Sequence, residues 1–264
     1  MKAHTARKRF GQHFLTDQAL VHRMVAAIAP RDDETVVEIG PGQGALTLPL
    51  LDEIRHLHVV ELDRDLIARL QQTIAPERLS IHAADALRFD FSALSKADGD
   101  LRVVGNLPYN ISTPLIFHLL SHVRCIHDMH FMLQKEVVDR LAARPGTSDC
   151  GRLSVMVQYH CQADYLFFVP PGAFSPPPKV DSAVVRLTPH GQLPYPVTDY
   201  RLFRQLVTQA FSQRRKVISN GVKSWLSPAQ IEAAGVDPRL RPDAIGLAEF
   251  AALANAATAL QETS

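Results

Sequence analysis

Cysteine, tryptophan and long apolar runs are all scarce in this sequence of 264 residues. The three cysteines form no CxxC pair and leave an odd count, which argues against a disulfide framework or a zinc site. No apolar run approaches the ~20 residues that a membrane span needs, and no apolar segment follows the basic N-terminus as it would in a signal peptide. We therefore expect a soluble cytoplasmic protein with no membrane contact and no metal.

Acidic residues are missing from two segments, although the whole chain is nearly balanced, with 28 Lys and Arg against 27 Asp and Glu. The segments are 1–9 and 200–227. Their basic residues are Lys2, Arg7, Lys8 and Arg9, and then Arg201, Arg204, Arg214, Arg215, Lys216 and Lys223. Such clusters favour contact with a polyanion, but charge alone fits a solvated helix face and a basic tail equally well.

Short apolar strands alternate with helical patterns over the first half of the chain. Strands are predicted, with helices between them, at 35–39, 56–61, 79–84, 101–105 and 126–134. This alternation predicts an α/β fold whose parallel sheet is covered by helices on both faces. Three later apolar runs have no long helix between them and are expected to add an antiparallel edge, at 154–160, 164–169 and 182–187.

The pattern also divides the chain into domains. Residues 1–16 form a basic arm before a helix predicted over 17–29, with Thr16 as its N-cap. Prolines then mark a linker shortly after residue 189, and the sequence beyond it has a helical pattern throughout. We therefore predict a larger first domain over 1–189 and a small all-helical domain over 190–264.

A glycine-rich turn follows the first predicted strand. Gly40, Gly42 and Gly44 give the spacing GxGxG, in which glycine lets the backbone turn tightly and approach a ligand. The dinucleotide pattern GxGxxG requires its third glycine at position 45, which is Ala45. A pyrophosphate cradle is therefore disfavoured. A loop against an adenosyl amino acid fits better, although the spacing alone also fits a turn without a ligand.

Carboxylates follow the next two strands. Glu61 ends the second strand, where a carboxylate can accept hydrogen bonds from both ribose hydroxyls of a nucleoside. Asp85 follows the third strand and can accept from an adenine amino group. Alone, Glu61 also fits a helix cap, and Asp85 a turn. Together with the glycine loop, they predict a ligand site at the carboxyl edge of the sheet.

The most specific motif in the chain is Asn106-Leu107-Pro108-Tyr109, directly after the fourth strand. The lone pair of an adenine N6 is delocalised into the ring, so this amine needs acceptors that turn the lone pair toward an incoming methyl group. Asn106 offers a side-chain oxygen, and the Pro108 turn frees the Leu107 carbonyl. Tyr109 can stack on the base. The motif predicts catalysis by positioning and electrostatics, and the alternative is a strand-end turn with a buried tyrosine.

A second aromatic ring is predicted in the same pocket. Phe174 precedes three consecutive prolines in FSPPPKVDS, which should make a stiff loop. Phe174 and Tyr109 are predicted to sandwich a flipped adenine, since stacking contributes ~1–3 kcal/mol per base. The alternatives for Phe174 are a core position or a partner-binding loop.

Seven motifs occur in an order that resembles the small-subunit rRNA adenine dimethyltransferases of the KsgA/RsmA family. They are RKRFGQHFL, EIGPGQGALT, VVELD, DAL, NLPYNIS, GRLSV and FSPPPKVDS, between residues 7 and 187. The resemblance implies a class I methyltransferase (Rossmann-like) fold with a mostly parallel seven-stranded sheet. It also implies S-adenosylmethionine as the methyl donor, bound by the first domain.

By the same resemblance, the substrate is 16S rRNA within the 30S subunit, where N6 of two adjacent adenosines in the 3′-terminal hairpin is dimethylated during ribosome biogenesis. The implied cofactor ligands are His13, Leu15, Gly40, Glu61, Asp85 and Asn106, to which the glycine loop adds Gly42. With an RNA substrate, the expected RNA contacts are Arg7, Lys8 and Arg9 in the arm, and Arg214, Arg215 and Lys216 in the helical domain. A monomer is expected.

Four alternatives remain. An Erm-like dimethylase of large-subunit rRNA shares the chemistry, but FSPPPKVDS and FGQHFL favour the small-subunit family. A DNA N6-adenine methyltransferase usually has a second proline in place of Leu107. An NAD-dependent dehydrogenase is opposed by Ala45. A non-catalytic ribosome assembly or RNA-binding factor could dispense with Asn106, which is present here.

Overall fold

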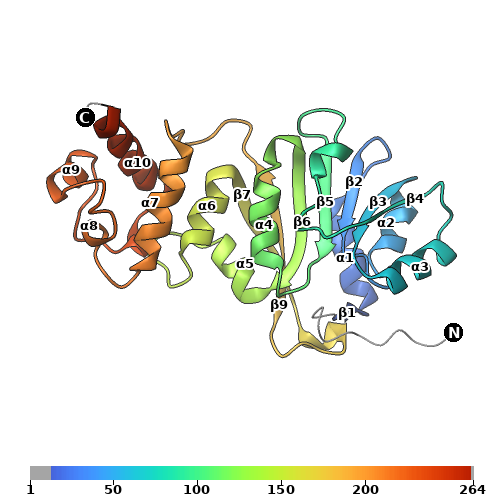
Figure 1. The fold of residues 1–264 in the computed structure, drawn as a ribbon. Helices are drawn as coiled ribbons and strands as arrows, with labels where there is room; N and C mark the ends of the chain where they lie inside the picture. Colours follow the sequence, from blue (N-terminus) through green and yellow to red (C-terminus); the bar gives the residue numbers. More distant parts are fainter. Residues whose placement is uncertain (1–12, 263–264) are drawn as a thin grey trace. The chain divides into compact units, whose positions relative to one another are not determined.

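One seven-stranded sheet organises the first part of the chain (Figure 1). In spatial order the strands are β4 (Leu79–Ala83), β3 (Leu57–Glu61), β2 (Thr35–Ile39), β5 (Leu101–Asn106), β6 (Ile126–Gln134), β9 (Ser182–Pro189) and β7 (Cys161–Val169). The strands from β4 to β6 run parallel, whereas β9 is antiparallel to β6. This computed structural model, which describes residues 13–262, confirms the mostly parallel seven-stranded sheet and its antiparallel edge.

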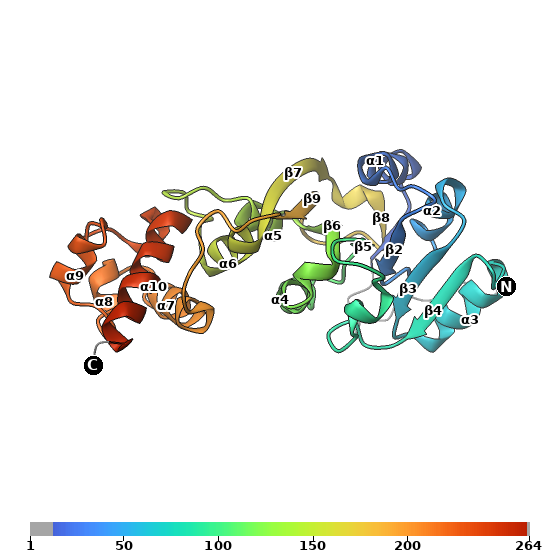
Figure 2. The same cartoon turned by 90° about the horizontal axis from the view of Figure 1, so that it is seen from above.

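Helices cover both faces of the sheet, so its central strands are largely buried and most of their residues are apolar. All five residues of β2 are buried, as expected for a parallel strand between two helical layers. Figure 2 shows α1 on one side of the sheet and α4 on the other. The helices that follow the early strands are α1 (Gln18–Ile28), α2 (Thr47–Glu53), α3 (Arg64–Thr73), α4 (Ser112–Leu120) and α5 (Lys135–Leu141).

The N-terminal arm is joined to the chain far downstream. Its first described element, β1 (Phe14–Leu15), pairs antiparallel with β8 (Phe174–Ser175). Asp17, and not Thr16 as predicted, caps α1, because its carboxylate accepts from Ala19 and Leu20 N–H at 3.0 and 3.1 Å. The Thr16 hydroxyl instead donates to a backbone carbonyl next to β8. The predicted RNA contacts Arg7, Lys8 and Arg9 lie outside the described residues.

The chain divides into two compact units. The first contains the described residues up to Val138 and the segment Ala163–Pro189, and the second contains Asp139–Gln162 and the residues from His190 onward. The predicted boundary after residue 189 places 139–162 in the wrong unit. This segment clusters with the C-terminal helices because the Tyr159 ring packs against Phe203, with ring centroids 4.8 Å apart.

The second unit is helical, including one segment predicted as a strand. Residues 154–160 belong to α6, since the Ser154 hydroxyl accepts from Gly151 N–H at 3.0 Å and opens a helix whose apolar residues are buried. That burial outweighs the strand preference of this run, which is rich in valine. The helices are α6 (Arg152–His160), α7 (Tyr200–Ser212), α8 (Ile218–Gly221), α9 (Pro228–Ala233) and α10 (Leu247–Glu262).

Short 3₁₀ segments complete the described elements: η2 (Phe91–Leu94), η3 (Val123–Cys125), η4 (Pro171–Ala173) and η5 (Pro242–Ala244). Among residues 13–262, no helix combines the length and apolar character that crossing a membrane would require.

Candidate functional site

A cavity of about 250 Å³ lies at the carboxyl ends of the central parallel strands. Open α/β sheets bind ligands at this edge. The structure brings ten of the predicted site residues together in its lining: His13, Leu15, Gly40, Gly42, Glu61, Asp85, Asn106, Leu107, Pro108 and Tyr109. They come from four separate strands, or the loops after them, and from the arm.

The glycine loop after β2 has the backbone that its spacing predicts. Gly40, Gly42 and Gly44 have φ values of +67°, +58° and +88°, a region that side chains with a Cβ rarely adopt. At Gly42 a Cβ would also stand 3.4 Å from the ring of Phe14. The missing side chain thus lets the arm close directly over the loop.

Glu61 is fixed at the end of β3 by backbone donors. Its Oε1 accepts from Leu62 and Asp63 N–H at 2.8 and 2.9 Å, and its Oε2 accepts a longer bond, 3.4 Å, from Gly42 N–H. Burial raises the pKa of Glu61 while these three bonds oppose the rise. A carboxylate has about four acceptor positions, so Glu61 retains capacity for a ligand. Asp85 also lines the cavity, and its Oδ1 accepts from Leu87 N–H at 2.9 Å.

Glu38 is a cavity residue that the sequence analysis missed. It is fully buried in β2 and lines the cavity, and its Oε2 accepts a 2.6 Å hydrogen bond from the Thr47 hydroxyl. Burial raises its pKa to about 8, opposed by the Thr47 bond and supported by the negative charge of Glu61. The sequence does contain a signal for this residue: Glu38 is the single charged residue of its strand and stands two positions before Gly40.

Acidic groups dominate the electrostatics of the cavity. Glu61, Asp63 and Asp85 line it beside Glu38, whose raised pKa keeps it mostly protonated at neutral pH, and none of its described lining residues is Lys or Arg. Such a surface favours a cationic ligand and repels a phosphate. A sulfonium-bearing adenosyl amino acid fits this lining, whereas the pyrophosphate of a dinucleotide does not, which agrees with the absence of a third glycine at Ala45.

Asn106, at the end of β5, has its side chain oriented by the arm. Its Nδ2 donates to the backbone carbonyl of His13 at 3.1 Å. Because the amide nitrogen is engaged there, the Oδ1 atom remains as an acceptor at the cavity. The turn beyond it is closed by a bond from Ile111 N–H to the Pro108 carbonyl at 3.1 Å.

Of the two predicted stacking rings, Tyr109 lines the cavity and Phe174 does not. The Tyr109 hydroxyl is bonded to Ser182 Oγ at 2.7 Å. Phe174 is 3% exposed and packs in the apolar core, opposite Leu15 in the β1–β8 pair. The sandwich is not formed in this structure, because strand pairing buries Phe174, and its stacking role stays a prediction.

Comparison with known proteins identifies the family. The model of the family described as ribosomal RNA adenine dimethylase matches residues 3–258. The chain belongs to the ribosomal RNA adenine dimethylase family. It is therefore an S-adenosylmethionine-dependent methyltransferase, as the NLPY motif and the acidic cavity predict.

Relatives of this methyltransferase are similar over nearly their whole length. A "Ribosomal RNA small subunit methyltransferase A" from Alcanivorax borkumensis is 66% identical, covering 97% of this chain and 91% of that protein. The protein of the same name from Pseudomonas aeruginosa is 59% identical, with 96% and 94% covered.

Two solved structures resemble the methyltransferase in fold. A dimethyladenosine transferase from Plasmodium falciparum has a TM-score of 0.78 and 26% identity, covering 91% of this chain and 96% of that one. The 23S rRNA methyltransferase ErmE has a TM-score of 0.73 and 24% identity, with 93% and 99% covered. The ErmE likeness shows the class I methyltransferase fold alone.

Replacing Glu38 with glutamine should remove one contribution to the pH dependence of this methyltransferase's stability. The pKa of Glu38 rises from 4.5 to about 8 on folding, so between these values the folded protein holds a proton that the unfolded chain releases. The Glu38 contribution to wild-type stability therefore falls as pH rises through this window, by up to about 1.4 kcal/mol per pH unit. Glutamine keeps the oxygen that accepts from Thr47 and has no proton to lose.

Urea denaturation of both proteins at pH 5, 6, 7 and 8 measures this difference. Glu38→Gln should gain stability relative to wild type as pH rises. A difference that is constant across the four pH values would show that Glu38 ionises normally.

The predicted RNA contacts of the second unit differ in how they are held. Arg215 and Lys216 are exposed. Arg214 is instead engaged within its own unit, with Nε 3.5 Å from the Asp243 carboxylate and a further bond to the Ser148 carbonyl. Arg215 and Lys216 are thus the more available pair for a polyanion.

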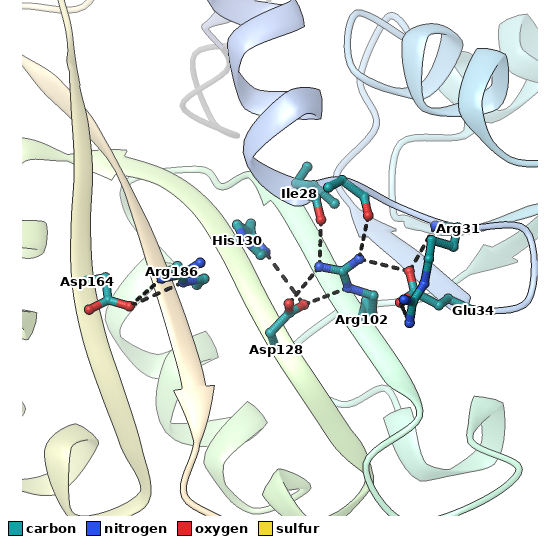
Figure 3. A network of polar contacts seen from close by, with 9 residues as sticks. Ile28, Arg31, Glu34, Arg102, Asp128, His130, Asp164 and Arg186 are labelled. Carbon is teal, nitrogen blue, oxygen red and sulfur yellow. Dashed lines mark hydrogen bonds and ion pairs between the residues drawn. The ribbon is translucent and has the colours of Figure 1, made fainter.

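A second polar network, absent from the sequence analysis, lies at the opposite end of β5 from Asn106 (Figure 3). The Arg102 guanidinium donates to Asp128 at 2.9 and 2.7 Å and to Glu34 at 2.8 Å. It also donates to the carbonyls of Ile28 and Ala29, at 2.6 and 3.2 Å. Arg102 therefore closes the C-terminus of α1 and ties that helix to the sheet.

Asp128, on β6, is the principal anion of this network. Burial raises its pKa, but the neighbouring His130 and the Arg102 guanidinium outweigh burial and hold that pKa well below its usual range. Both side chains of the Arg102–Asp128 pair are less than 10% exposed. The pair is therefore a buried ion pair, in which losing one partner is costly.

Proposed function

We propose that this enzyme dimethylates N6 of two adjacent adenosines in the 3′-terminal hairpin of 16S rRNA, within the 30S subunit, as a step of ribosome biogenesis. Identity of 66% over 97% of the chain to a relative named for the small ribosomal subunit carries this proposal. The large-subunit alternative has no comparable support, since the 24% identity to ErmE shows only a shared fold.

The residues of the cavity suit this chemistry. When bound, S-adenosylmethionine supplies a methyl group on a positively charged sulfur. Asn106 Oδ1 and the Leu107 carbonyl would accept the two N–H bonds of the adenine amine, which turns the nitrogen lone pair out of conjugation and toward the methyl carbon. No strong base is needed, because the remaining N–H becomes acidic as the new bond forms. The rate gain then comes from positioning and from oriented dipoles.

Individual roles follow from the placement of the side chains. Glu61 and Asp85 would accept from the ribose hydroxyls and the adenine amino group of the cofactor. Gly40 and Gly42 allow close approach of its amino-acid part, and His13 and Leu15 would close the arm over it. Tyr109 offers its ring to the target base.

We place the enzyme in the cytoplasm as a monomer, since its proposed substrate is the small subunit itself. The first unit would supply the chemistry, and the helical second unit would hold rRNA through exposed cations on a chain of nearly neutral net charge. Arg7, Lys8 and Arg9 of the arm are proposed to assist.

Reversing the charge of Arg215 and Lys216 to glutamate should weaken binding to small subunits and flatten its salt dependence. Each lost phosphate contact reduces the slope of log K against log salt by about one. Affinities measured between 50 and 200 mM salt test this. Arg239→Glu is the matched control, because Arg239 is already paired with Asp237 at 3.0 Å. An unchanged slope in the double variant would remove this face from the RNA contact.

Methyl transfer from labelled S-adenosylmethionine tests the function itself. Small subunits from cells that lack the modification serve as substrate, with large subunits and plasmid DNA in parallel, and N6,N6-dimethyladenosine is identified by mass spectrometry. Product from small subunits alone is expected. Product from large subunits would overturn the proposed small-subunit substrate. No product from any of the three would indicate a non-catalytic assembly factor instead.

A further inference from the structure

His13 joins three parts of the proposed active site. Its backbone carbonyl accepts from Asn106 Nδ2 at 3.1 Å. Its imidazole is stacked on Tyr109, with ring centroids 5.6 Å apart and planes inclined by 25°. Its Nδ1 lies 2.8 Å from the carbonyl oxygen of Pro176, in the proline loop. One residue therefore orients the acceptor amide and covers the stacking ring.

A specific hydrogen bond holds the imidazole in this place. The Pro176 carbonyl can only accept, so His13 Nδ1 must carry the proton. The ring is fixed at its edge by this bond and on its face by Tyr109. Tyr109 is itself fixed, since its hydroxyl is bonded to Ser182 Oγ.

The stacked rings leave no room for a base between them. Aromatic planes in contact are about 3.5 Å apart, so a ring inserted between two others requires about 7 Å. The His13 and Tyr109 centroids are 5.6 Å apart, and both side chains line the cavity. A target adenine that stacks on the cavity side of Tyr109 must therefore displace the imidazole.

We propose that the His13 imidazole occupies the target-base position on Tyr109 in the absence of RNA and swings away when the adenine stacks there. The proposal rests on the proposed function, because it concerns the base that the enzyme methylates. It makes His13 a specificity-determining residue, since an entering base must stack on Tyr109 better than the imidazole does. Purines, with two fused rings, meet this condition more readily than pyrimidines.

The movement requires only the side chain of His13. Its backbone stays in place because β1 remains paired with β8 and its carbonyl keeps the bond from Asn106. Rotation of the ring breaks one hydrogen bond, to Pro176. Asn106 therefore keeps its orientation while the stacking face becomes free.

NMR of the full chain with labelled histidine rings reads the displacement directly. The protein is saturated with S-adenosylhomocysteine, so that added adenosine cannot occupy the cofactor site, and His13→Ala assigns the His13 signals. Before adenosine is added, the Tyr109 ring current should shift the His13 ring protons upfield. Adenosine should move them downfield, and cytidine should move them much less. His13 signals that move further upfield would show a sandwich and overturn the proposal.

Kinetics with small subunits provide the second test. His13→Ala should lower KM for small subunits roughly two- to tenfold, because the base no longer competes with a stacked ring. His22→Ala, an exposed histidine on α1, is the control and should change nothing. A raised KM, an unchanged KM, or a loss confined to cofactor affinity would each overturn the proposal. The NMR test requires no methyl transfer, so a failure of the proposed substrate is distinguished from a failure of this inference.

Discussion

Asn106→Ala is expected to lower kcat for methyl transfer roughly 10²–10³-fold, the usual effect of removing one preorganised polar group at a reacting centre. The structure explains the size of the effect, because Asn106 Nδ2 is held by the His13 carbonyl at 3.1 Å and Oδ1 is left as the acceptor. Alanine removes this acceptor and leaves the amine lone pair conjugated with the adenine ring. Single-turnover rates at saturating cofactor and small subunits measure the loss.

Two comparisons separate an acceptor role from a cofactor-binding role. Affinity for S-adenosylmethionine, measured by calorimetry, should fall much less than kcat. Asn106→Asp keeps an acceptor but cannot donate to His13, so its loss should be smaller than that of alanine. If cofactor affinity in Asn106→Ala falls as far as the rate, Asn106 serves the cofactor and not the adenine.

Arg102→Met is expected to destabilise the first unit by about 3–5 kcal/mol, the cost of leaving a buried charge without its partner. Methionine fills similar space but leaves Asp128 and Glu34 without their shared cation. It also removes the donors to Ile28 and Ala29, which close α1. Urea denaturation followed by circular dichroism measures the change in free energy of unfolding.

Arg31→Met is the matched control for Arg102. Arg31 pairs with the same Glu34 at 3.1 Å, but its side chain is 72% exposed. An exposed pair contributes about 0–1 kcal/mol, so this variant should unfold almost like wild type. Equal losses in the two variants would show that burial of the Arg102 pair has no special consequence.

Much of the fold and site could be predicted because the signals are local. The early strands alternate with helices, and burial on both faces leaves β2 with one ionisable residue, Glu38, whose charge is suppressed there. Glycine spacing fixed the loop, since Gly40 and Gly42 require positive φ. Residues at the ends of parallel strands meet at one edge, so Glu61, Asp85 and Asn106 share a cavity.

Contacts between distant segments explain where the structure departs from the predictions. The run 154–160 has strand-forming residues, but packing of Tyr159 against Phe203 buries it as a helix and joins it to the second unit. Phe174 was predicted to stack on the base; in this structure it lies in the core, on the β8 strand that pairs with β1, and its stacking role stays a prediction. Neither partner is near in sequence.

The sequence by itself determined the α/β class, the strand-end ligand groups and the family, because periodicity, glycine spacing and ordered motifs are properties of short segments. Only the tertiary structure decided which side chains from distant segments lie in contact and how deeply they are buried. Glu38 has a raised pKa because the sheet buries it next to Glu61. His13 covers Tyr109 because β1 pairs with a strand about 160 residues later. Such effects depend on distance and burial, which local sequence does not specify.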